Sequence, residues 1–380
     1  MSGFTNAVFL ARQVATEPGM IIRPLANLFG FFVNFVFNIV YAIGPVNSLG
    51  ITIIVVTIIF RALMLPMHIK SQKSMRKMQE LKPELDKIKA KYGDTKDPEL
   101  RRKMSTEQSA LMAKHDANPL KGCFPLLLTM PLFMGLNFVL QQAFLYITRL
   151  QNVYYDLAVA IQRVPDYINI FIPPGLSIEQ HRALPDYHAN AVRLLPNSML
   201  DNAAELRRLQ DLGLSFEEAR MRVGETINIA IPEEFARVIN RFTAENWAWL
   251  SEQIPEYYWT TIAEINERRQ AMESFFGLSM IEPSGWGWPS IIIPILVGVT
   301  MLCASWISQQ RAASAEMDEK AKMQQRIMLI VMPIFLMFIT VGFPAGLGVF
   351  WITGQVFQGV TDFIMLKKAG IPIKLPFRRS

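Results

Sequence analysis

Residues 50–67 read GITIIVVTIIFRALMLPM, an apolar run that a single arginine, Arg61, interrupts. The run approaches the roughly 20 residues that a helix needs to cross a bilayer. A guanidinium at the centre of a membrane helix costs roughly 2.5–3.5 kcal/mol on insertion scales, so such a residue normally faces protein or water and has a function. The stretch therefore predicts a membrane-spanning helix that presents Arg61 to a water-filled space.

The other apolar residues also gather in blocks. Of the 380 residues, 51% are hydrophobic, and several blocks are long enough to cross a bilayer. We therefore predict an all-α polytopic membrane protein with five transmembrane helices, at residues 49–67, 120–148, 286–308 and, as two helices, 327–366. The two cysteines, Cys123 and Cys303, fit neither a metal-binding spacing nor a disulfide framework. No metal and no other cofactor is predicted.

The loop charges predict the side of the membrane on which each loop lies. Residues 68–121 hold 14 Lys or Arg against 8 Asp or Glu, whereas residues 150–285 hold 19 Asp or Glu, 11 Arg and no lysine. The loop at 309–326 and the tail at 367–380 are also basic. Cytoplasmic loops carry an excess of Lys and Arg. We therefore expect the N-terminus outside, the C-terminus in the cytoplasm, and residues 149–285 as an extracytoplasmic insert.

Three segments outside the spans have helical patterns. In the N-terminal segment, residues 1–48, polar residues recur on one face of residues 20–43, which favours an interfacial amphipathic helix over a sixth span. Residues 68–119 repeat apolar side chains every three or four positions around a turn at Gly93, which predicts a cytoplasmic helical hairpin. The insert is predicted to be mostly helical. The apolar positions of the hairpin include Met75, Met78, Leu81, Leu85 and Met104.

Four stretches connect the chain to a known family. They are IIFRALMLP at 58–66, NPLKGCFPLLLTMPLF at 118–133, PSIIIPILVGVTM at 289–301, and QQRIMLIVMPIF at 324–335 followed by FPAGLGVFWITGQ at 343–355. In these stretches and in the order of its spans, the chain resembles the YidC family of membrane protein insertases, which has relatives in mitochondria and chloroplasts. The resemblance covers residues 20–148 and 272–370.

The resemblance implies a five-span core in the bacterial plasma membrane, with a hydrophilic groove open to the cytoplasm and the lipid but closed on the outer side. It also implies a membrane protein insertase and chaperone that acts alone or alongside a Sec translocon, without nucleotide hydrolysis. The expected groove residues are Arg61, Thr57, Thr129, Asn137 and Gln355. Thr129 stands where the family often has glutamine, and Gln355 where it often has asparagine. The resemblance assigns no role to the long insert.

In such a groove, Arg61 would keep the space hydrated and attract acidic residues of the segment being moved. A charge pair at low effective dielectric supplies energy comparable with the penalty for carrying polar groups across the bilayer core. The alternative is that Arg61 is a structural charge bonded to backbone carbonyls. Thr57, one turn earlier, either faces the groove or bonds back to its own helix.

The hairpin is expected to receive the substrate. Methionine is flexible and polarisable, which suits the binding of many unrelated apolar segments; ordinary packing between the two helices is the alternative for these residues. The expected partners are nascent membrane proteins and the lipid bilayer, with a Sec translocon and the ribosome as further candidates and no DNA. For the basic tail, contact with anionic lipid is favoured over contact with ribosomal RNA.

Two other classes of function fit part of the sequence. A transporter or channel would use Arg61 as an anion site, but transporters typically have paired repeats and interrupted helices, and neither pattern is present. An assembly factor for membrane complexes would use the same groove, and the sequence does not separate it from an insertase. No enzyme is predicted, because the predicted spans contain no histidine and their one carboxylate, Asp362, lies near the end of the fifth.

Overall fold

The computed structural model divides the chain into two compact units. Unit 1 comprises Met1–Phe29, Gly50–Gln141 and Met280–Ser380, and unit 2 comprises Gly30–Leu49 and Gln142–Ser279. The structure describes residues 23–93, 97–115, 117, 119–165, 167, 170, 208–215, 218–219, 221–222, 235–236, 239–240, 242, 244–310 and 319–370. Parts of the predicted N-terminal segment, the insert, the loop at 309–326 and the basic tail therefore lie outside the described residues.

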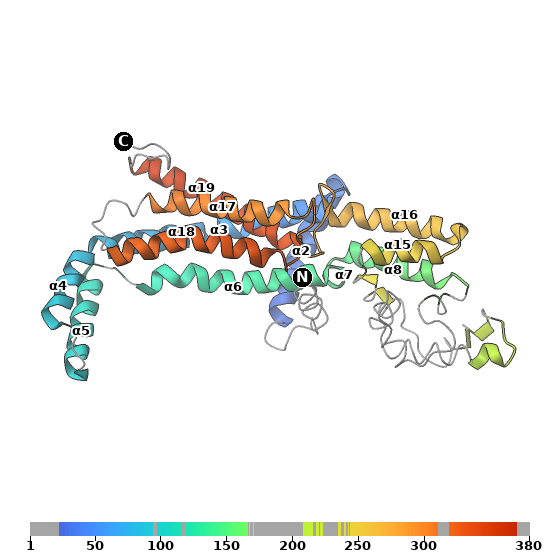
Figure 1. The fold of residues 1–380 in the computed structure, drawn as a ribbon, viewed down its shortest axis with the longest axis horizontal. Coiled ribbons are helices and arrows are strands. Elements are labelled where there is room, and N and C mark those ends of the chain that lie inside the picture. Colours follow the sequence, from blue (N-terminus) through green and yellow to red (C-terminus); the bar gives the residue numbers. More distant parts are fainter. Residues whose placement is uncertain are drawn as a thin grey trace. The chain divides into compact units, whose positions relative to one another are not determined.

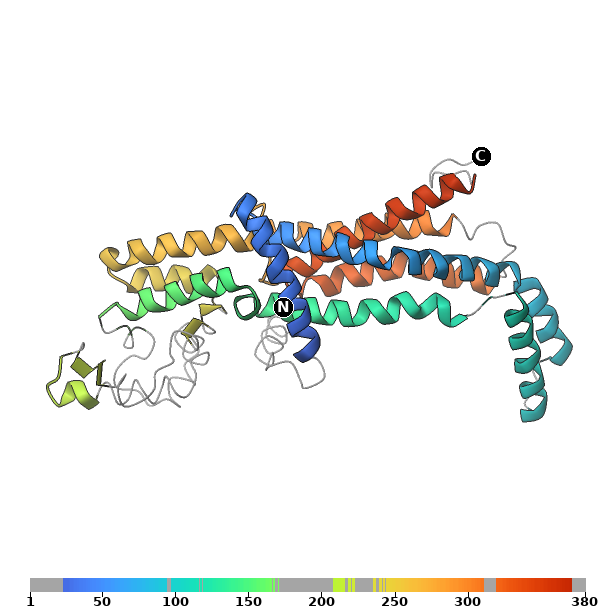
Figure 2. The same ribbon diagram turned by 180° about the vertical axis from the view of Figure 1, so that it is seen from behind.

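Long helices make up unit 1. They are α3 (Ser48–Glu80), α6 (Pro119–Gln141), α17 (Ile292–Gln309), α18 (Glu319–Thr340) and α19 (Ala345–Lys368). These helices run alongside one another in both views (Figures 1 and 2), and α17 packs against both α18 and α19. Many of their large apolar side chains are exposed, such as Leu63, Phe335 and Val360. Helices that are apolar on nearly all sides are typical of a membrane bundle.

Four of the described helical segments are long and apolar enough to cross a membrane. They are α2 (Arg23–Ile43), Ser48–Ser74 within α3, α17 and α19, and Leu329–Thr340 within α18 forms a shorter apolar helix. A mostly helical, multi-pass membrane protein is therefore confirmed. The five-span topology and its orientation stay predictions. The interfacial placement of α2 is also still a prediction, because α2 meets the same criteria of length and composition as a span.

Helix α3 extends well beyond the predicted first span. The prediction ended this span at residue 67, but the helix continues through Pro66 to Glu80. Proline removes one helical hydrogen bond, and membrane helices tolerate that loss where neighbouring groups satisfy the freed carbonyl. Arg61 and His68 consequently lie on one continuous helix.

Two shorter helices follow α3. Helix α4 (Lys82–Tyr92) has Pro83 in its first turn, and α5 (Pro98–Lys114) begins after Asp97, whose side chain accepts a hydrogen bond from the Glu99 amide at 2.9 Å. Proline and an acidic N-cap are typical of helix starts. The two helices lie side by side (Figure 1), and the Lys91 ammonium donates to both carboxylate oxygens of Glu107 at 3.0 and 3.1 Å.

Unit 2 is built on a core of aromatic and aliphatic side chains. Its helices include α7 (Ala143–Tyr146), α8 (Thr148–Gln162), α15 (Ala244–Gln253) and α16 (Glu256–Glu273), and a two-residue antiparallel pair, β1 (Ser274–Phe275) and β2 (Leu278–Ser279), follows α16. Helix α8 packs against α16. The buried core includes Phe144, Tyr154, Phe235, Phe242 and Trp247.

The polar stripe of α2 binds protein groups in unit 2. The Asn34 side-chain oxygen accepts from the Thr148 amide at 3.1 Å, and the Arg149 Nε donates to Asn38 at 2.9 Å. The Arg149 guanidinium also lies 4.3 Å from the centre of the Tyr41 ring. The polar residues that suggested a water-facing surface therefore hold the start of α8.

Candidate functional site

The Arg61 side chain lies against the backbone of α19. A Cβ atom on Gly354 would come within 2.5 Å of the Arg61 Nη2 atom and 3.0 Å of its Nε atom. The guanidinium therefore occupies space that only a glycine leaves open at this position. Arg61 is half-buried, and among the described residues no hydrogen bond or ion pair to its guanidinium is present. Its N–H donors are thus not used by another described side chain or carbonyl.

The Thr57 hydroxyl bonds back to its own helix, which was the second of the two predicted arrangements. Its side chain is 1% exposed, and its hydroxyl donates to the Ile53 carbonyl at 2.6 Å. A hydroxyl that bonds back to the preceding turn is already satisfied by its own helix. The Thr57 side chain is therefore buried, and its hydroxyl hydrogen is used within α3.

The other predicted groove residues lie on α6 and α19. Thr129 and Asn137 are half-buried on α6, and Asn137 accepts a hydrogen bond from Gln141 at 3.1 Å. Gln355 is half-buried on α19, directly after Gly354. Within the part of the chain that the structure describes, Arg61 hydrogen-bonds to none of these three residues. The structure thus brings Arg61 together with Gly354, which the sequence did not single out.

The predicted receiving surface is only partly accessible. Leu81 is 5% exposed and therefore packs within the protein. Met78, Leu85 and Met104 are half-buried, and the side chain of Met75 lies outside the described residues. Packing accounts for Leu81, whereas the three half-buried side chains retain surface that an apolar segment can contact.

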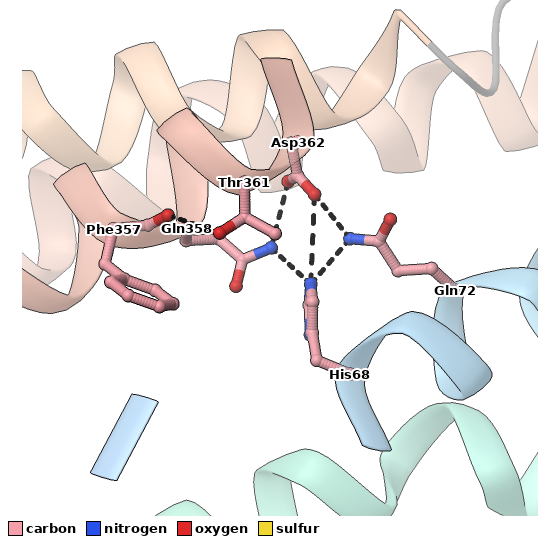
Figure 3. A network of polar contacts seen from close by, with 6 residues as sticks. All are labelled: His68, Gln72, Phe357, Gln358, Thr361 and Asp362. Atoms are coloured by element: carbon pink, nitrogen blue, oxygen red, sulfur yellow. Dashed lines mark hydrogen bonds and ion pairs between the residues drawn. The ribbon is translucent and has the colours of Figure 1, made fainter. Parts of the chain in front are cut away.

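A partly buried polar cluster joins α3 to α19 (Figure 3). The Gln72 amide nitrogen donates to Asp362 Oδ1 at 2.6 Å and lies 2.7 Å from His68 Nε2. The Gln358 amide nitrogen donates to Asp362 Oδ2 at 2.9 Å and also contacts His68 Nε2. His68 Nε2 lies 3.8 Å from Asp362 Oδ1, and Asp362 is fully buried. We call these four side chains the His68–Asp362 cluster.

The sequence prediction missed this cluster because it ended the first span at residue 67. That boundary placed His68 and Gln72 in the hairpin, and it left Asp362 as an isolated carboxylate. One signal could have revealed the cluster. Positions 61, 68 and 72 lie on one face of a continuous helix, and positions 354, 358 and 362 recur every four residues on another.

Comparison with known proteins places the chain among insertase relatives. A model of the 60Kd inner membrane protein family matches residues 41–177 and 251–370, more than half of the chain. The membrane protein insertase MisCA of Bacillus subtilis (strain 168) is 46% identical over 89 residues, which are 23% of this chain and 34% of the relative. The membrane protein insertase YidC 1 of Halalkalibacterium halodurans is 42% identical over 114 residues, 30% of this chain and 40% of the relative.

A third similar protein is also named as a membrane protein insertase. The membrane protein insertase YidC 1 of Bacillus cereus is 38% identical over 117 residues, 30% of this chain and 45% of the relative. The matched regions thus cover less than half the length of each of these relatives.

Proposed function

The chain belongs to the 60Kd inner membrane protein family, and from this premise we propose that it is a membrane protein insertase in which Arg61 receives acidic groups of the segment being moved. The observation that carries the proposal is the half-buried Arg61 guanidinium, which lies against Gly354 of α19 and has no hydrogen bond or ion pair among the described residues. Relatives named as membrane protein insertases support the same activity.

The physical task of an insertase is to lower the cost of moving polar groups through hydrocarbon, where each unsatisfied backbone group costs several kcal/mol. A cation held at membrane depth attracts a carboxylate more strongly than it would in water, because the effective dielectric constant is lower. Transfer of the apolar part of the substrate into lipid is itself favourable. The proposed cycle therefore needs no nucleotide hydrolysis.

The charges of the loops support the orientation that we propose for the chain. Five spans, with the N-terminus outside and the C-terminus in the cytoplasm, place the basic α4–α5 hairpin on the side where nascent chains arrive. Half-buried Met78 and Met104 would contact the incoming apolar segment. A Sec translocon and the ribosome are the partners that we propose beyond the substrate and the bilayer.

Substitution of Arg61 tests this function directly. Purified wild type, Arg61→Ala and Arg61→Lys are reconstituted in liposomes with two single-span substrates, whose translocated tails are acidic or neutral. We expect Arg61→Ala to reduce protease protection of the acidic-tail substrate by about tenfold, which corresponds to a loss of about 1.4 kcal/mol. Arg61→Lys keeps the charge and should retain part of the activity. The neutral-tail substrate should be little affected.

The same assay separates the alternatives. If protection of the acidic tail is unchanged in Arg61→Ala, the arginine has a structural role and the proposed mechanism is wrong. If wild type protects neither substrate, an assembly factor becomes the better description of the protein.

A further inference from the structure

Helices α3 and α19 meet through side chains. Helix α19 packs closely against α17 and α6. The backbones of α3 and α19 stay further apart over most of the described length of α3. The contacts between the two helices include the Arg61 guanidinium on Gly354 and, two helical turns further along, the His68–Asp362 cluster (Figure 3). Side chains at both of these levels therefore connect α3 to α19.

Asp362 lies at the centre of the His68–Asp362 cluster. Asp362 is fully buried, and each of its carboxylate oxygens accepts a hydrogen bond from a glutamine on a different helix, Gln72 on α3 and Gln358 on α19. A buried carboxylate that loses its donors is strongly unfavourable. Any rotation or sliding of α19 against α3 would break at least one of these bonds, so the cluster fixes the register of the two helices.

That register decides where Gly354 lies. Residues 354, 358 and 362 follow one another at intervals of one turn on the same face of α19, and the opposite partners Arg61, His68 and Gln72 share one face of α3. Gly359, by contrast, faces α17, because a Cβ there would lie 3.7–3.8 Å from Ile307 and Ala304. A substitution at Asp362 is therefore expected to move Gly354 relative to Arg61.

We infer that the His68–Asp362 cluster is a positioning device, which holds α19 against α3 so that the Arg61 guanidinium stays on Gly354 and is presented to substrate in one orientation. The inference about helix register stands on the contacts alone, and its consequence for substrate rests on the proposed function. Asp362 and His68 are positioning residues here, because their effect on substrate passes through Arg61.

The first experiment measures the register without any substrate. In a chain with Cys123→Ala and Cys303→Ala, we introduce Arg61→Cys and Gly354→Cys and measure the rate of crosslinking by a short bis-methanethiosulfonate reagent in liposomes. The shorter cysteine side chain at position 61 leaves room for a side chain at position 354. We expect Asp362→Asn and His68→Gln to lower this rate at least about threefold, as expected for side chains that share one network.

Thr361→Val is the matched control for this experiment. Thr361 precedes Asp362 on α19, and its hydroxyl donates to the Phe357 carbonyl of its own helix at 2.9 Å. This variant should therefore crosslink at the same rate as the parent double-cysteine chain. His68→Gln replaces the imidazole on α3 with an amide and leaves Asp362 in place, so it serves if Asp362→Asn does not fold. Equal crosslinking rates in the parent chain, the Asp362→Asn chain and the His68→Gln chain would overturn the inference.

The second experiment asks whether the effect passes through Arg61. Protease protection of acidic-tail and neutral-tail substrates is compared for Asp362→Asn alone and in the Arg61→Ala background. A positioning role predicts a selective loss for the acidic tail that disappears when Arg61 is absent. A positioning role is contradicted if Asp362→Asn reduces protease protection equally for both tails. It is also contradicted if Asp362→Asn reduces protection of the acidic tail as much in the Arg61→Ala background as in the wild-type background. If wild type inserts neither substrate, the proposed function fails while the crosslinking result still decides the register.

Discussion

The Arg61 guanidinium lies where a side chain on residue 354 would be, and this contact leads to a specific prediction. In Gly354→Ala, the added Cβ would lie 2.5 Å from Nη2, so the flexible end of Arg61 must move while its charge is retained. Alanine is a better helix former than glycine by up to about 1 kcal/mol, so the helix itself is not weakened. We expect protease protection of acidic-tail substrates to fall several-fold and protection of neutral-tail substrates to stay unchanged.

Gly359→Ala is the control for this prediction. Residue 359 lies on the same helix, and a Cβ there would make only ordinary contacts, the nearest at 3.7 Å from Ile307. The variant therefore has the same gain in helix propensity without displacing Arg61. Equal insertion of acidic tails by the alanine variants at 354 and 359 would mean that the contact with Gly354 has no role in substrate binding.

Sequence alone predicted Arg61 but not the residues that position it. A charge inside an apolar run is conspicuous on its own, whatever the surrounding fold. Gly354 and Asp362 become important only through partners on α3, almost 300 positions earlier in the chain. Such pairings depend on how helices pack, which local periodicity does not determine. Thr57 shows the same limit, because only the structure separates a groove-facing hydroxyl from one bonded to Ile53.

Among the helices, α3 differs most from its predicted boundary. The abrupt change in composition after Pro66 ended the predicted span at residue 67, whereas the observed helix continues to Glu80. Local propensity is a weak guide where tertiary packing stabilises the helix. The prolines at the starts of α4 and α5 fit the observed helices, because a first-turn proline removes no hydrogen bond that the helix would otherwise make.

The α4–α5 pair should loosen in acid. Hydrogen bonds from Lys91 and then from Tyr92 lower the pKa of Glu107 from its usual 4.5. A carboxyl group whose pKa is lowered by folding stabilises the fold at pH values above its pKa in the unfolded chain. This contribution is lost as the pH falls through the pKa of the group in the folded protein. We therefore expect hydrogen exchange around Lys91 in α4 and Glu107 in α5 to increase below pH 4.5, after correction for the intrinsic exchange rate.

Glu107→Gln is the control for the acid effect. Glutamine does not titrate, so the exchange of this variant should already be faster at neutral pH and should not change further on acidification. The pair is exposed at the surface, so high salt should weaken it as well. If exchange in wild type is the same above and below pH 4.5, the Lys91–Glu107 bond does not stabilise the hairpin.

Taken as a whole, the molecule has two compact units whose cores differ in kind. Unit 1 is a bundle with exposed apolar side chains, as a membrane protein requires, and the blocks of apolar sequence predicted it well. Unit 2 has a conventional buried core that also encloses a charge pair. Arg269 is 5% exposed and donates to Glu273 at 2.6 Å and to Asn266 at 2.8 Å. Nothing in the local sequence distinguishes this arginine from a solvated one.

The buried pair allows unit 2 to be weakened separately. Removal of one partner of a buried ion pair costs about 3–5 kcal/mol, because the other charge stays buried. Arg269→Met should therefore make α8 and α16 sensitive to limited proteolysis, and the fluorescence of Trp247, whose ring centre lies 5.2 Å from the guanidinium, should change. Insertion of acidic and neutral tails should be retained, because Arg61, Gly354 and the His68–Asp362 cluster all belong to unit 1.

A double variant distinguishes loss of the charge pair from loss of packing. In Arg269→Met with Glu273→Leu, no charge is left buried, and apolar replacement of a buried pair is often neutral or stabilising. Protease resistance of unit 2 should therefore return towards wild type. If Arg269→Met abolishes insertion and the double variant restores it together with protease resistance, unit 2 is required for the activity, and the separation between the two units that we predict does not hold.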